Sequence, residues 1–172
     1  MKLNLGCEIH KFKDFINIDI DKSVNPDLLC DIKKLPYEDN SVDFIYAGHL
    51  LEHLYYDLVP EYLSEWRRVL KIGGKLVIVV PDVGGSMKRY AKGEYSIDHL
   101  LAQVFGRYYS WDTVEQRHQF IYDIYKLKES VQRVSWSAVE ELNWAAPPVE
   151  IAEFIGTEIS AADWQIGCVL TK

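Results

Sequence analysis

The sequence has 172 residues, of which 48% are hydrophobic and 26% are charged, as in a soluble globular protein that forms one domain over residues 1–172. Its net charge of −7 and the absence of a lysine or arginine run argue against a nucleic-acid-binding surface. No apolar run approaches the roughly 20 residues that cross a bilayer, so no membrane span is expected. A strand pattern directly after Met1 predicts no signal peptide, and the three cysteines have no metal-ligand spacing. We therefore expect a cytoplasmic protein with reduced thiols, either a monomer or a homodimer.

The N-terminal part of the chain predicts short strands over residues 2–6, 15–20 and 27–30. Only about nine residues separate the first two strands, fewer than a helical crossover normally needs, so the first crossover helix should be short or absent. Gly6 ends the first strand in a turn. A dinucleotide site needs several glycines there, and a Walker-type turn is missing, so NAD and ATP fit this turn poorly.

The central stretch, residues 30–54, predicts a turn, a buried strand over residues 42–47 and the start of a helix. The small residues Ala47 and Gly48 would let a ligand approach the backbone closely. In open α/β sheets, ligands bind beyond the carboxyl ends of the strands. Asp31, Ala47, Gly48 and His49 are therefore expected on one ligand-facing edge.

The remaining chain predicts an amphipathic helix over residues 58–70, with Pro60 in its first turn, followed by a buried strand over residues 75–80. A helix over residues 126–134 and strands over 135–139 and 165–170 complete the sheet. Residues 83–117 are less regular and rich in glycine. Their aromatic side chains could stack on an acceptor or pack a small helical cap onto the sheet; they are Tyr90, Tyr95, Tyr108, Tyr109 and Trp111.

Three segments together resemble a known family. They read LNLGC at residues 3–7, CDIKKLPYEDNSVDFIYAGHLLEHL at 30–54 and EWRRVLKIGGKLVIVVPD at 65–82. This pattern resembles the class I S-adenosylmethionine (SAM)-dependent methyltransferases, most of all their small LNLGC…LEHL members. The resemblance is good over residues 2–82 and looser beyond. The sequence departs from the family where Glu8 occupies the neighbourhood of its second glycine, which bears on the geometry of the loop.

The resemblance implies an α/β fold with a Rossmann-like, doubly wound, mostly parallel seven-stranded sheet. The implied strand order is 3-2-1-4-5-7-6, with the last strand antiparallel. It also implies methyl transfer from SAM, which leaves S-adenosylhomocysteine. The acceptor is unknown, and a small molecule or glycan is expected, with a saccharide or sugar-lipid hydroxyl as first choice and residues 83–117 as the acceptor-binding cap. The alternative is a non-catalytic SAM-fold module that binds a partner.

By the same resemblance, Asp19 accepts hydrogen bonds from the ribose hydroxyls, with Asp21 as the alternative. Asp31 faces the exocyclic amine of adenine, and Ile32 packs on its ring. The remaining residues expected at the cofactor are Leu5, Gly6, Cys7, Ile20, Ala47, Gly48 and His49.

Methyl transfer to an oxygen usually needs a general base, and His49 and Asp82 are the candidates that we select. The other candidates near the expected strand ends are His53, His99 and His118. His49 and His53 lie one helical turn apart and could bind zinc, but no third ligand has suitable spacing, so no metal site is expected. His53 is expected to be satisfied by Glu52 or by the backbone.

Overall fold

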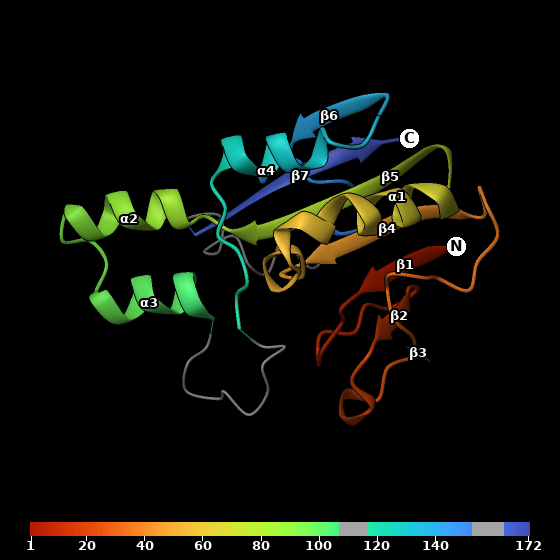
Figure 1. The fold of residues 1–172 in the computed structure, drawn as a ribbon, viewed down its shortest axis with the longest axis horizontal. Coiled ribbons are helices and arrows are strands. Elements are labelled where there is room, and N and C mark those ends of the chain that lie inside the picture. Colours follow the sequence, from red (N-terminus) through yellow and green to blue (C-terminus); the bar gives the residue numbers. More distant parts are fainter. Residues whose placement is uncertain (107–116, 153–163) are drawn as a thin grey trace.

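The computed structural model describes residues 1–106, 117–152 and 164–172 (Figure 1). One seven-stranded sheet forms the centre, in the order β3-β2-β1-β4-β5-β7-β6. Its strands are β1 (Lys2–Leu5), β2 (Ile16–Asp19), β3 (Leu28–Leu29), β4 (Val42–Gly48), β5 (Leu70–Pro81), β6 (Ala138–Glu141) and β7 (Gln165–Thr171). Strands β1 to β5 pair in parallel, whereas β7 runs antiparallel to β5 and β6. The predicted sheet and strand order are confirmed, although β6 begins at Ala138 instead of residue 135.

One face of this sheet is covered by α1 (Val59–Val69) and α4 (Ile124–Val131) (Figure 1). Trp66 of α1 and Leu127 of α4 are fully buried in the same cluster as the strand residues Ile45 and Ile78. Pro60 lies in the first turn of α1, as predicted. Helix α4 begins two residues earlier than predicted because Asp123 caps it by accepting the Lys126 N–H at 2.7 Å.

On the opposite face, the described residues that pack against the sheet include those of the loop after β1. No helix interrupts residues 6–15, all of which the structure describes, so the prediction of a short or absent first crossover helix is confirmed. Phe12 and Phe15 from this loop pack instead against Phe44 and Val77 of the sheet. The Phe15 and Phe44 rings meet edge to face, with their centroids 6.0 Å apart. Two aromatic side chains thus bury the surface that a crossover helix would bury.

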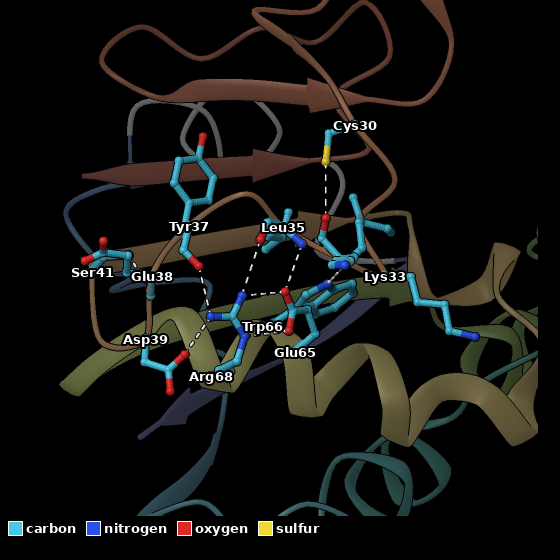
Figure 2. A network of polar contacts seen from close by, with 12 residues as sticks. Cys30, Lys33, Leu35, Tyr37, Glu38, Asp39, Ser41, Glu65, Trp66 and Arg68 are labelled. Atoms are coloured by element: carbon cyan, nitrogen blue, oxygen red, sulfur yellow. Dashed lines mark hydrogen bonds and ion pairs between the residues drawn. The ribbon is translucent and has the colours of Figure 1, made fainter.

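The connection between β3 and β4 is helix-free, and polar side chains of α1 hold it in place (Figure 2). Glu65 Oε1 accepts the Leu35 N–H at 2.8 Å. Trp66 Nε1 donates to the Ile32 carbonyl at 3.0 Å. Arg68 pairs with Glu65 and also donates to the Tyr37 carbonyl at 2.9 Å. Helix α1 therefore fixes the chain that leaves the end of β3, where the adenine-binding residues are expected.

Residues 83–117 are more regular than predicted. They contain α2 (Val83–Ala91) and α3 (Ile97–Phe105), which lie side by side beyond the carboxyl ends of β4 and β5 (Figure 1). Asp82 accepts the Gly85 N–H at 2.9 Å and caps α2. Gly84 and Gly85 thus lie in the first turn of a helix, where we expected a flexible loop. Three of the predicted aromatic residues, Tyr108, Tyr109 and Trp111, lie outside the described residues.

None of the helices in the described ranges is both long and apolar enough to cross a membrane.

Candidate cofactor and acceptor site

The ends of β1, β2 and β4 meet at one edge of the sheet. Backbone hydrogen bonds join the turn after β1 to β2, since the Cys7 N–H donates to the Ile18 carbonyl at 3.1 Å. Leu50, just after β4, covers Gly6, because a Cβ added to Gly6 would lie 2.7 Å from Leu50 Cδ1. The structure therefore brings together the predicted residues on these three strands.

The turn after β1 keeps a left-handed backbone at two positions. Gly6 has φ +62°, and Glu8 has φ +42°. Only glycine adopts this region without a steric cost. Glu8 thus has a backbone conformation that favours glycine, in the neighbourhood where the family carries its second glycine.

Asp19 is the buried acid of this edge, with 8% of its surface exposed. Its Oδ2 accepts the Glu8 N–H at 2.9 Å, and its Oδ1 accepts the Asp21 N–H at 2.9 Å. A carboxylate has about four acceptor positions, so lone pairs remain for a ligand's hydroxyl groups. Asp21, the alternative candidate, is exposed and caps a short 3-10 helix, η1 (Lys22–Val24), by accepting the Ser23 N–H.

The expected adenine side of the site is more open. Asp31 is exposed and accepts the Lys33 N–H at 2.8 Å. Ile32 is partly buried against the main core, whereas Ile20 keeps 66% of its surface exposed just after β2. An exposed isoleucine beside a buried acid provides apolar surface on which a planar ring can pack.

The predicted cofactor residues divide into backbone and side-chain contributors. Leu5, Cys7 and Ala47 are buried, so they can present only their backbone at this edge. Burial raises the pKa of the Cys7 thiol to about 11, and the charge of Asp19 adds to this shift. Gly48 is close to the phenol of Tyr46, since a Cβ there would lie 2.3 Å from the Tyr46 hydroxyl oxygen. A side chain at residue 48 would therefore have to displace the Tyr46 ring.

His49 is held between two polar side chains. Its Nδ1 lies 3.2 Å from Glu52 Oε1, and its Nε2 lies 2.7 Å from Gln165 Oε1 at the start of β7. Its ring stacks on Trp164, with the centroids 5.2 Å apart. The backbone of His49 has φ +52°, an unfavourable conformation for a non-glycine residue that often marks a functional position.

Glu52, in the 3-10 helix η2 (Leu51–His53), is a carboxylate without access to solvent. Burial alone would raise its pKa, but the hydrogen bond and charge of His49, followed by the charges of His53 and His118, hold the pKa below its usual value. Among the described residues, Glu52 Oε2 has no hydrogen-bond partner. The side chains of Glu52, His53 and His118 lie close enough that one ligand atom from each is within 4.8 Å of the others.

Asp82, the second candidate base, also lies beyond a strand end. Its backbone N–H donates to the Trp164 carbonyl at 2.8 Å, so Asp82 and His49 both contact the start of β7. Its carboxylate caps α2.

The sequence predicted that Glu52 or the backbone satisfies His53, and the backbone does so through the Arg117 carbonyl. The contact of Glu52 with His49 was not predicted. The spacing of His49 and Glu52 is a signal that could have found this pair, because residues three apart face each other on a helical turn. Gln165 and His118 lie far along the chain, and only the fold brings them to this site. The structure supplies His118 as the third potential metal ligand that spacing could not reveal.

Comparison with known proteins relates part of this chain to methyltransferases. Residues 9–78 match a protein-family model described as a methyltransferase domain. The chain is 32% identical over 110 residues to an uncharacterized protein of Methanocaldococcus jannaschii, covering 56% of this chain and 48% of that protein. It is 42% identical over 86 residues to Ribosomal RNA-processing protein 8 of Caenorhabditis elegans, covering 44% of this chain and 23% of that protein. The chain thus spans half the length or less of these curated relatives.

Solved structures share the fold across 99% of this chain. A SAM-dependent methyltransferase from Archaeoglobus fulgidus superimposes with a TM-score of 0.62 at 14% identity, with 85% of that chain covered. A SAM-dependent methyltransferase from Mesorhizobium loti gives 0.62 at 14% identity, with 90% covered. A phosphoethanolamine N-methyltransferase of Haemonchus contortus gives 0.55 at 14% identity, with 48% covered. These likenesses confirm the predicted fold.

Proposed function

We propose that this chain, whose family match and fold are those of a class I SAM-dependent methyltransferase domain, is an active enzyme that methylates a hydroxyl group of its acceptor. The observation that carries the proposal is the pair formed by His49 and the buried Glu52 at the carboxyl edge of the sheet. A histidine whose second nitrogen is held by a buried carboxylate is suited to accept a proton from a hydroxyl.

On the cofactor side, we assign Asp19 to the ribose hydroxyls and Asp31 to the adenine amine. The support for Asp19 is its burial, its position at the end of β2 and its remaining lone pairs, which fit a vicinal diol. Ile20 and Ile32 are assigned to the adenine ring, and Gly6 and its neighbours provide backbone contacts. When bound, SAM supplies a methyl group on a positively charged sulfonium.

On the acceptor side, Gln165 Oε1 already occupies an oxygen position 2.7 Å from His49 Nε2. We propose that the Gln165 amide turns away from Nε2 and that the acceptor hydroxyl oxygen takes its position. His49 is then neutral with its proton on Nδ1, donated to Glu52 Oε1, and its unprotonated Nε2 accepts the proton of the acceptor hydroxyl. The carboxylate stabilises the imidazolium that forms. Asp82 is the second candidate base. Its loss would also uncap α2, so we prefer His49.

The acceptor class that we propose is a saccharide or a sugar-lipid, bound under the cap of residues 83–117. Exposed apolar side chains on α2 and α3 support this assignment, because sugar rings pack on such surfaces; they are Met87, Tyr90, Ile97 and Phe105. One curated relative is named for ribosomal RNA processing. The net charge of −7 weighs against RNA as the acceptor here. A non-catalytic SAM-binding module remains the alternative.

The test is transfer of labelled methyl groups from SAM to a panel of saccharides, sugar-lipids, amines and RNA. His49→Gln should lower kcat by about 100-fold or more, the usual contribution of a general base, with SAM affinity nearly unchanged. His10→Gln is the matched control, because His10 is an exposed histidine outside the proposed base pair. If wild type transfers no labelled methyl group to any acceptor of the panel, the result would support the binding module.

A further inference from the structure

We propose that Glu52, His53 and His118 bind a first-row divalent transition-metal ion of the zinc class. This site lies on the far oxygen of the carboxylate that holds His49. The donor atoms of the three side chains already lie within 4.8 Å of one another. Two imidazoles and one carboxylate are a donor set that zinc and related divalent ions take, with bond lengths of about 2.0–2.2 Å.

The first supporting observation is the unsatisfied oxygen of Glu52. The Glu52 side chain is 1% exposed, and its Oε2 has no hydrogen-bond partner among the described residues. An unpartnered oxygen of a buried carboxylate is costly, because it is removed from water without compensation. Its Oε1 is already used by His49. A cation on Oε2 would satisfy the remaining oxygen and offset the buried charge.

The second observation is how the two histidines are oriented. His53 Nδ1 lies 3.3 Å from the Arg117 carbonyl oxygen, and His118 Nδ1 lies 2.9 Å from the Gln103 carbonyl oxygen. A carbonyl accepts a hydrogen bond, so each Nδ1 carries the proton and each Nε2 keeps a lone pair. Histidine ligands in metal sites are usually held by such hydrogen bonds through their second nitrogen. Within the described part of the chain, neither Nε2 takes part in a hydrogen bond.

A metal ion at this site would link two separate segments of the chain. Glu52 and His53 come from η2, just after β4, whereas His118 follows the segment that contains α3. The Gln119 and Phe120 N–H groups both donate to the Glu52 carbonyl, at 2.7 and 3.1 Å, so the backbone already joins the two segments. Three protein ligands also leave an open position on the metal for water or an acceptor oxygen. Binding itself needs neither SAM nor the acceptor, so the inference is independent of the proposed methyl transfer.

The test is metal titration of the full, tag-free chain without SAM, following Zn²⁺ by calorimetry and Co²⁺ by its visible absorption. We expect one equivalent to bind with a micromolar or lower Kd, and Mg²⁺ in large excess not to displace it, because Mg²⁺ favours oxygen ligands. His53→Ala and His118→Ala should each weaken binding at least tenfold. His10→Ala should bind like wild type, since it removes an exposed histidine outside the cluster.

X-ray absorption of the Zn²⁺-loaded wild type provides a second readout that does not depend on the folding of the variants. It should show two imidazole ligands in the first shell. Absence of stoichiometric binding by wild type would overturn the proposal, as would folded His53→Ala and His118→Ala proteins that both bind like wild type. A first shell with fewer than two imidazoles would also overturn it. If metal binds while methyl transfer is never detected, the metal site stands and the proposed function fails.

Discussion

The carboxylate of Asp19 accepts the backbone N–H of Glu8 at 2.9 Å, so the acid that ends β2 also holds the turn that follows β1. The edge of the sheet where we propose that SAM binds is therefore organised by one side chain. The same carboxylate accepts the Asp21 N–H through its other oxygen. Removal of Asp19 should change both the ligand contacts and the shape of the turn.

Asp19→Ala should weaken SAM binding at least tenfold, because each charge-assisted hydrogen bond to a ribose hydroxyl contributes about 1.5–3 kcal/mol. Asp19→Asn keeps the size of the side chain but loses its charge and one of the two acceptor oxygens, so it should also weaken SAM binding and disturb the turn. Asp21→Ala should have much less effect, because Asp21 is exposed and caps η1. Calorimetry with each variant measures the dissociation constants. If Asp21→Ala is the more damaging change, the ribose acid has been assigned to the wrong residue.

Gly6→Val should abolish SAM binding and lower the melting temperature to a smaller degree. A side chain at φ +62° is strained, and its Cβ would meet Leu50. The Gly6→Ala protein and the Gly6→Ala/Leu50→Ala double variant distinguish the causes. Restoration of binding in the double variant would assign the effect to the contact with Leu50. Unfolding of Gly6→Val at room temperature would show that packing requires the glycine.

Glu8→Gly should leave SAM binding intact and make the protein as stable as wild type or up to about 1.5 kcal/mol more stable. Relief of a left-handed non-glycine backbone gains about 1–2 kcal/mol, and the added freedom of glycine in the unfolded chain costs about 0.5–1 kcal/mol. Glu8→Val should be destabilised, since β-branched residues avoid positive φ. Urea unfolding of the three proteins measures these differences. A clear loss of stability in Glu8→Gly would contradict the strain at this position.

Much of the fold could be predicted because it depends on local patterns. The β-branched run of β5, the apolar spacing of α1 and the short first connection predicted these elements and the missing crossover helix, whereas the seven-stranded sheet and its strand order were implied by the family resemblance. The resemblance to a methyltransferase domain agrees with the family-model match over residues 9–78, and the predicted fold is confirmed by the solved structures. A helical cap in this region was one of two alternatives, but the bounds of α2 and α3 were not predicted. Gly84 and Gly85 suggested a loop, whereas capping by Asp82 allows a helix to begin there.

The site was less predictable, because its polar contacts join distant segments. The partner of His49 in β7, Gln165, has no local sequence signal, and neither does the approach of His118 to Glu52. The acids at the ends of β2 and β3 were expected from strand position together with the family resemblance.

The α1 contacts predict a pH dependence. The hydrogen bond from Arg68, together with the Leu35 N–H and the charge of Arg68, holds the pKa of Glu65 below its usual 4.5, although burial opposes this shift. A carboxylate with a lowered pKa in the folded state stabilises the protein above its unfolded pKa. That stability is lost as the pH falls through the folded pKa. The free energy of unfolding of wild type should therefore fall more between about pH 6 and about pH 3 than that of Glu65→Gln. Equal losses in the two proteins would rule out this contribution.

Calorimetric titration of the wild-type chain with SAM tests the central claim most directly. The account predicts one binding site with a dissociation constant in the micromolar range, about −8 kcal/mol at 1 μM, and no binding of NAD. S-adenosylhomocysteine should bind the same site and compete with SAM. A protein that is folded by circular dichroism but gives no heat of binding with SAM or S-adenosylhomocysteine would contradict the account.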